Sequence, residues 1–89
     1  MTKYLCKGAI VKAIAGREIN EIFIITHVEN GYAYLVNGKS RPIENPKKKN
    51  IKHLQLLQKS EFVALDFGNL TNAHIIKIIK DFKKSKDYK

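Results

Sequence analysis

The first third of the chain has two apolar stretches, residues 9–14 and 22–28, on either side of a polar segment, residues 16–21. Both apolar stretches are rich in β-branched residues, which favour strands. The segment between them is too short and too polar for a buried helix. Gly16 adopts positive φ without steric cost, and Asn20 is the residue type that next most readily does so. The pattern therefore predicts two strands joined by a loop of one fixed shape.

The second strand leads into a β-meander marked by two Asn-Gly pairs. Asn-Gly at 30–31 is a strong hairpin signal, because a type I′ turn needs positive φ at both central residues. Residues 32–36 then alternate as a third strand, and Asn-Gly at 37–38 predicts a second turn of the same kind. Residues 39–43 would return as a fourth strand, which Pro42 confines to a sheet edge or a strand end.

After the meander the chain becomes strongly basic. Residues 44–46 break the sheet, and residues 47–50, Lys-Lys-Lys-Asn, are predicted to form an exposed basic loop. Residues 51–57 can form a fifth strand, and residues 58–70 predict a loop or a short added strand. Five short strands with tight turns are typical of a small twisted barrel of the SH3-like type, so the predicted fold is mostly β.

The last part of the chain has helical periodicity. Thr71 is suited to N-cap a helix that starts directly after it. Apolar residues then recur at helical spacing with lysines outside, which predicts an amphipathic helix over residues 72–84. We expect residues 85–89 to fray. The predicted organisation is a barrel with its following basic segment, residues 1–70, and a helix and tail, residues 71–89, packed on the same domain.

Length and composition narrow the class of protein. A chain of 89 residues with 44% hydrophobic residues predicts one small domain with a modest core. The single cysteine, Cys6, excludes an internal disulfide and a multi-cysteine zinc site, and a buried position is favoured for it over a reactive thiol. No apolar run approaches the about 20 residues of a membrane span, and residues 1–10 lack the pattern of a secretion signal. We therefore expect a cytoplasmic protein that does not enter a membrane.

Charge is the strongest compositional signal. The chain carries 17 Lys and Arg against 8 Asp and Glu, a formal net charge of +9. An excess of this size on a small domain is the usual electrostatic footprint of a protein that binds a polyanion. Lysines that only keep the protein soluble are the alternative. Clustering favours nucleic acid, because residues 39–52 include six basic residues and one acidic residue, Glu44.

A known motif has the same order of residues as the first strand and its loop. Gly8 precedes the strand, Val11 and Ala13 follow at alternate positions, and a second glycine, Gly16, opens the polar turn. This order resembles the KOW motif of ribosomal proteins and transcription elongation factors. The motif usually has another glycine where this chain has Asn20, a residue that also tolerates the left-handed region.

The resemblance extends beyond the motif. Residues 38–54, GKSRPIENPKKKNIKHL, look like the segment that follows it in bacterial KOW-domain RNA-binding proteins. Those proteins are in turn similar to archaeal and eukaryotic large-subunit ribosomal proteins. The resemblance covers residues 4–56. It implies an SH3-like barrel that binds structured RNA, and ribosomal RNA is the first candidate.

Basic side chains at three places predict the RNA surface: the loop of residues 16–21, the predicted edge strand 39–43 and the basic segment that follows. The predicted contacts are Lys12, Arg17, Lys39, Arg41, Lys47, Lys48, Lys49, Lys52 and His53. Each lysine that neutralises a phosphate releases a counterion, and a guanidinium also binds phosphate bidentately. We expect alanine at all three positions 47–49 to weaken RNA binding without unfolding the domain.

Two tyrosines give the third strand a further predicted role. Tyr32 and Tyr34 alternate on one strand face and are candidates for stacking on unpaired bases, although that face could equally belong to the core or lie under the helix. The alternative function is an SH3-like protein-interaction module that docks on the transcription or translation machinery through this face or the C-terminal helix. RNA binding would depend on salt, whereas docking would need an exposed apolar patch.

Catalysis and metal binding have little support in the sequence. His27, His53 and His74 lack paired-ligand spacing, and no Gly-Lys-Ser/Thr follows Gly16 to form a nucleotide loop. We therefore predict no catalytic residue, no metal and no cofactor. We expect a chain that is monomeric when free, with ribosomal RNA as its main partner and ribosomal or transcription proteins as further partners.

Overall fold

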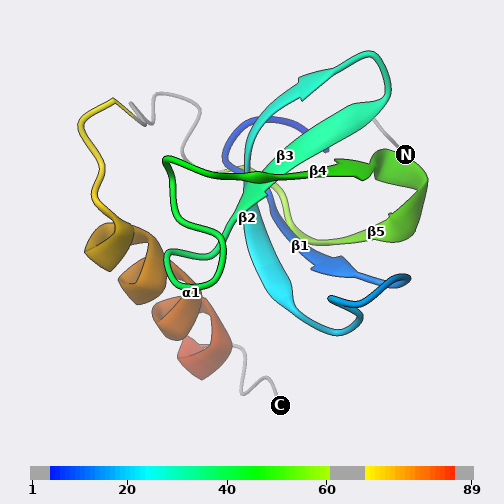
Figure 1. Ribbon diagram of the computed structural model, residues 1–89. Coiled ribbons are helices and arrows are strands. Elements are labelled where there is room, and N and C mark those ends of the chain that lie inside the picture. The colour runs from blue at the N-terminus through cyan, green and yellow to red at the C-terminus, as the bar shows by residue number, and fades with distance from the viewer. Residues whose placement is uncertain (1–4, 61–67, 86–89) are drawn as a thin grey trace.

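The computed structural model describes residues 5–60 and 68–85, and it shows an antiparallel sheet with a helix beside it (Figure 1). The predicted mostly-β fold with five strands and one C-terminal helix is confirmed. The strands lie in the order β4-β3-β2-β1-β5. Predictions for residues 61–67 and 86–89 fall outside the described residues. In chain order the elements are β1 (Ile10–Ala13), β2 (Ile22–Glu29), β3 (Tyr32–Val36), β4 (Lys47–Asn50), the short 3₁₀ helix η2 (Ile51–His53), β5 (Leu54–Gln58) and α1 (Asn72–Ser85).

Both faces of the sheet are buried, and β2 shows this most clearly. Phe23 and Ile25 belong to a cluster with side chains from β1, β3 and β5 on one face. Ile22 and Ile24 point to the opposite face, where they pack with α1. Because successive strand residues point to opposite faces, a strand buried on both sides reads as a continuous apolar run. This double burial explains the unbroken apolar sequence at the start of β2.

The sheet is open in the described residues. β4 and β5 form its two edges, and they do not pair with each other although only η2 separates them in the chain. The η2 segment instead forms hydrogen bonds with the β2–β3 turn and with the residue that follows β1. The Ile51 amide donates to the Gly31 carbonyl at 3.1 Å, and the Ile14 amide donates to the His53 carbonyl at 2.9 Å. A closed SH3-like barrel is therefore not confirmed.

The two Asn-Gly pairs form different turns. Asn30 and Gly31 have φ of 52° and 81°, as the predicted type I′ turn between β2 and β3 requires. The prediction of a second turn of the same kind is wrong. Gly38 has φ of 82°, but Asn37 is not among the residues with positive φ, and its Oδ1 accepts the amides two and four residues further on, both at 2.9 Å. An asparagine side chain that caps these amides closes a wider bend.

The predictions for residues 39–43 and residues 47–50 are both wrong, because the segment predicted as a strand is irregular and the segment predicted as a loop is a strand. Residues 39–43 form bends and a turn rather than a strand, and the strand is Lys47–Asn50, with Lys49 opposite Ala33 of β3. The bend closed by the asparagine side chain leads the chain away from β3, and Pro42 has no amide to donate to a ladder. The chain rejoins the sheet only at the lysines, which are well suited to an edge strand.

The fifth strand also begins later than predicted. The Asn50 side chain accepts a hydrogen bond from the Lys52 amide at 2.8 Å and so caps η2. Only after this short helix does β5 begin, at Leu54, and pair with β1. A side chain that caps nearby amides competes with strand pairing, which explains the delay.

Cys6 is exposed, so the predicted core position is wrong. Its neighbours Leu5 and Ala9 are buried, and the Ala9 amide donates to the Cys6 carbonyl at 3.0 Å. The chain thus makes a tight turn before β1. The turn buries the residues on both sides and leaves the cysteine itself in solvent.

Helix α1 begins and packs as predicted. The Thr71 hydroxyl accepts the His74 amide at 3.2 Å, and the Thr71 amide donates back to Nδ1 of His74 at 3.1 Å. This reciprocal pair is a capping box with histidine in the place of the usual glutamate. Ile75, Ile79 and Phe82 are buried against the sheet. No helix in the described part of the chain has the length and apolarity needed to cross a membrane.

A side-chain clamp ties the segment of residues 37–46 to α1. The Asn72 Oδ1 accepts the Ile43 amide, and its Nδ2 donates to the Glu44 carboxylate, both at 2.8 Å. The bond from Asn72 lowers the pKa of Glu44, because it favours the ionised form. Gly38 lies so close to the helix that a Cβ atom there would be 2.6 Å from the Asn72 carbonyl oxygen and 2.8 Å from Ile76. Segment and helix therefore pack as one unit.

Candidate nucleic-acid interface

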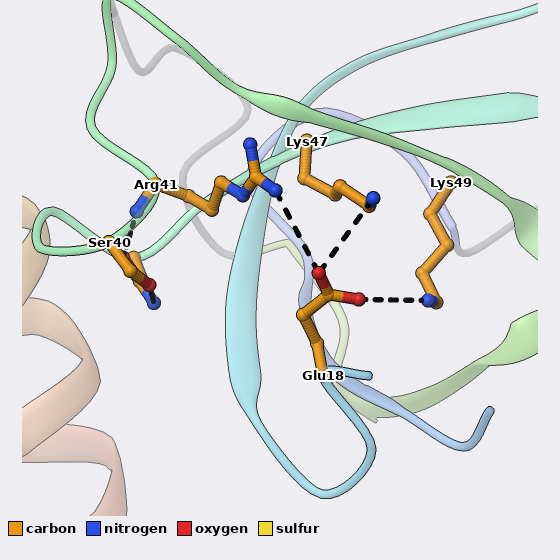
Figure 2. Close-up of polar contacts among 6 residues, drawn as sticks. Glu18, Ser40, Arg41, Lys47 and Lys49 are labelled. Atoms are coloured by element: carbon orange, nitrogen blue, oxygen red, sulfur yellow. Dashed lines mark hydrogen bonds and ion pairs between the residues drawn. The ribbon is translucent and has the colours of Figure 1, made fainter. Parts of the chain in front are cut away.

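Three basic side chains converge on one carboxylate, that of Glu18 (Figure 2). The Lys49 ammonium donates a hydrogen bond to Glu18 Oε1 at 3.3 Å. Lys47 Nζ and Arg41 Nη2 approach Oε2 at 3.7 and 3.8 Å. We call these four residues the Glu18 cluster. Its members come from three segments: the loop between β1 and β2, the segment of residues 37–46, and β4.

The loop that carries Glu18 has the fixed shape predicted from its sequence. Gly16 and Asn20 both have positive φ, 87° and 73°. The Asn20 amide donates to the Ala13 carbonyl at 2.8 Å, and the Ile19 amide to the Gly16 carbonyl at 3.2 Å. A Cβ atom on Gly16 would lie 2.7 Å from the Lys49 ammonium, so the glycine also makes room for that side chain.

Strand alternation divides the three consecutive lysines of β4 between two faces. Lys47 and Lys49 pair with Leu35 and Ala33, so their side chains lie on the face of the first hydrophobic cluster and reach Glu18 at its border. Lys48 points the opposite way and is exposed. Lys49 is only 9% exposed. The prediction of one exposed basic loop over residues 47–50 is therefore wrong, because only part of this charge faces solvent.

Glu18 is ionised and largely enclosed. Its side chain is 15% exposed. Desolvation is the largest single influence on its pKa and raises it, but the hydrogen bond from Lys49 and the charges of Lys47 and Lys49 together outweigh desolvation, so the pKa lies below its ordinary value. Three cations facing one carboxylate leave positive charge uncompensated in the cluster.

The opposite face of β2, β3 and β4 carries aromatic rings. His27 and Tyr34 stack with ring centroids 4.2 Å apart and an interplanar angle of 7°. The Lys48 ammonium lies 4.7 Å from the centroid of the Tyr32 ring, in a cation–π contact. Tyr32 is 38% exposed, and α1 packs farther along the strand, at Val36. The two tyrosines therefore belong neither to the core nor to the surface under the helix, and each ring already has a partner within the chain.

The structure brings some predicted RNA contacts together and separates others. Arg41, Lys47 and Lys49 meet in the Glu18 cluster. Lys39 lies apart from it, in a groove beside α1. Lys12 is half-buried on β1. The contacts that are exposed are Arg17, Lys39, Lys48, Lys52 and His53.

Two residues of this region were not among the predicted contacts. Glu18 organises the cluster, yet its partner Lys49 is 31 positions away and no local pattern links the two. His27 stacks on Tyr34 across the β2–β3 ladder, and this contact follows from the strand register. The register of a hairpin closed by the Asn30-Gly31 turn places His27 opposite Tyr34. The contact of His27 could therefore have been predicted from the sequence, whereas that of Glu18 could not.

Comparison with known proteins adds no family to these observations. No protein-family profile matches this chain, and no curated protein sequence matches it. In residues 5–60 and 68–85, no group of three or more His, Cys, Asp or Glu side chains is placed to hold a metal ion.

Proposed function

We propose that this protein binds structured RNA, with ribosomal RNA as the first candidate, through β4 and the two loops that meet it at Glu18. The observation that carries the proposal is the Glu18 cluster itself. Arg41 and Lys47 lie 3.8 and 3.7 Å from the carboxylate, beyond hydrogen-bond length, so their donors remain able to bind phosphate oxygens. A carboxylate that holds cations in fixed positions lowers the entropy cost of binding a rigid phosphate backbone.

Two further exposed cations lie next to the Glu18 cluster in the chain, although Lys48 points to the other face of β4. Lys48 lies on β4 and Lys52 in η2, directly after it, and both are exposed. Cations held on a strand and a short helix meet phosphates of a folded RNA by position, without reading base identity. Lys49, by contrast, is assigned a structural role, because it is buried and hydrogen-bonded to Glu18.

We further infer that the sheet corresponds to the SH3-like barrel of a KOW domain. Asn20 supports this inference, since its φ of 73° is the left-handed conformation that the motif's usual glycine would adopt freely. The positive φ of Gly16 and the polar loop between two apolar strands fit the same motif. RNA binding by such a domain is then the function that the resemblance and the charge both favour.

Binding to fragments of ribosomal RNA, measured by fluorescence anisotropy over a salt series, tests the proposal. The variant is Arg41→Ala/Lys47→Ala, which removes the two cluster cations that remain able to bind phosphate, and the control is Lys77→Ala/Lys84→Ala, which removes the same charge from exposed positions of α1. Each lost phosphate contact makes the dependence of log affinity on log salt shallower by about 0.7–0.9. We expect a change of about 1.4–1.8 for the variant and little for the control. Equal slopes for wild type and both variants would refute the proposed surface.

A further inference from the structure

A groove with a volume of about 430 Å³ lies between α1, the start of β2 and the bend that follows β3. Its apolar lining consists of Ile22, Ile76 and Ile79. Its basic lining comes from two sides, with Lys39 on the bend and Lys80 and Lys83 on α1. The volume is in the range of sites that hold small ligands or a few peptide side chains.

The sequence builds this groove through the close approach of the bend to the helix. Gly38, with φ of 82°, lets the bend lie against the Asn72 carbonyl and the Ile76 side chain. The bend itself is held by the Asn37 side chain, which accepts two amides at 2.9 Å. The lining is therefore set by a glycine and an asparagine cap, so the groove is preformed.

The charge in the groove differs from the charge in the Glu18 cluster. Within the described residues, Lys39, Lys80 and Lys83 form no ion pair, and all three are exposed. Glu21 is the acidic residue of the lining. The site thus combines an excess of available cations with an apolar floor. Such a combination suits a ligand that carries both negative charge and an apolar group.

We propose that the groove binds an acidic peptide segment of a partner protein. An apolar side chain of the segment rests mainly on Ile76, which is partly exposed, beside the edges of Ile22 and Ile79, and flanking carboxylates pair with the lysines of the two sides. RNA is the less suitable occupant, because a phosphodiester backbone gains nothing from an apolar floor and its bases would lose contacts with water there. The proposal is independent of RNA binding, since none of the groove lysines belongs to the Glu18 cluster.

Titration of the ¹⁵N-labelled full chain, followed by amide NMR, tests the proposal with a defined probe. The probe is the peptide acetyl-Asp-Glu-Leu-Leu-Asp-Glu-amide. We expect saturable shifts at the amides of Ile22, Ile76 and Ile79. In the variant Lys80→Gln/Lys83→Gln we expect the affinity to fall about tenfold. The matched control, Lys77→Gln/Lys84→Gln, removes the same charge from α1 outside the groove and should bind like wild type.

Two altered peptides test the apolar contacts with the isoleucines separately from the ionic contacts with the lysines. A peptide with serine in place of both leucines should lose the shifts at the isoleucines, and one with Asn and Gln in place of the acids should lose most of its affinity. Equal weakening by the control variant would show non-specific attraction and overturn the proposal. Stronger shifts of the same amides by an RNA hairpin at equal concentration would assign the groove to RNA and also overturn it. An absence of saturable shifts with the unaltered peptide would do the same.

Discussion

Lys48 and Lys49 are neighbours in the chain, yet they lie in two different regions of the molecule. Lys49 is 9% exposed and donates to Glu18 on the inner face of β4. Lys48 is exposed on the outer face, where it lies over the Tyr32 ring. The comparison shows that a run of like charges in a sequence has no single role, because a strand sends alternate side chains to opposite environments. Burial and partner decide which lysine is structural and which is available for binding.

The largest effect is expected from Lys49→Ala. It removes the hydrogen bond to a largely enclosed, ionised Glu18, and we expect a loss of about 3 kcal/mol in the free energy of unfolding. Urea denaturation measures it. A loss no larger than that of Lys48→Ala would mean that the two faces of β4 do not differ as described.

The same result bears on the triple alanine change at 47–49, which we now expect to destabilise the fold as well as weaken RNA binding.

Gly16→Ala tests the same contact from the backbone side. The alanine must adopt φ near 87° and its Cβ would displace the Lys49 ammonium, so we expect a loss of about 2 kcal/mol. Gly31→Ala is the matched control, because φ there is 81° and no atom lies within 4 Å of the added Cβ. It should cost about 1 kcal/mol in the same urea experiment. Equal losses in the free energy of unfolding for the two variants would show that displacement of the Lys49 ammonium contributes nothing to the effect of Gly16→Ala.

Glu18→Gln should give a smaller effect that depends on pH. At pH 7 we expect a loss of about 1 kcal/mol, because the cations keep a polar partner but lose its charge. The folded-state pKa of Glu18 lies below its ordinary value of 4.5, so its ionisation stabilises the fold above that pH and the contribution disappears as pH falls through the folded-state pKa. The difference between wild type and variant, measured by thermal unfolding, should therefore shrink in acid. A difference that is constant with pH, or that equals that of Glu21→Gln, would contradict this assignment.

The smallest change in stability is expected from Lys48→Ala. The exposed cation–π contact with Tyr32 contributes about 0.5 kcal/mol, so the urea midpoint should hardly move. RNA affinity at low salt should nevertheless fall, because this lysine faces solvent. If Lys48→Ala kept its RNA affinity but lost stability, Lys48 would be a structural residue, and the proposed difference between the two faces of β4 would be wrong.

Local signals predicted the hairpin and the helix well. The Asn30-Gly31 turn and the Thr71 cap each follow from a few neighbouring residues. The segment from Asn37 to Asn50 was predicted wrongly, because an asparagine side chain can either enter a tight turn or cap amides, and only the tertiary structure decides between them.

The three cations of the candidate site, Arg41, Lys47 and Lys49, were among the predicted contacts, but Glu18, the carboxylate they surround, was not. The basic character of residues 39–52 is plain in the sequence, but the pairing of Lys47 and Lys49 with Glu18 depends on contacts between distant segments. The number of charges can be read from the sequence, but which of them are paired with a distant, buried partner is known only from the tertiary structure.

The hydrogen bond between Asn72 and Ile43 makes the motion of the segment of residues 37–46 measurable by hydrogen exchange. The Ile43 amide, 29 positions from Asn72, donates to a side chain of α1 rather than to a neighbouring strand. Its exchange with deuterium therefore requires the helix to move away, whereas an amide in the centre of the β2–β3 ladder requires the sheet to open. The exchange rate of that one amide reports how often α1 leaves the sheet, and with it how often Arg41 loses the anchor that holds its segment in place.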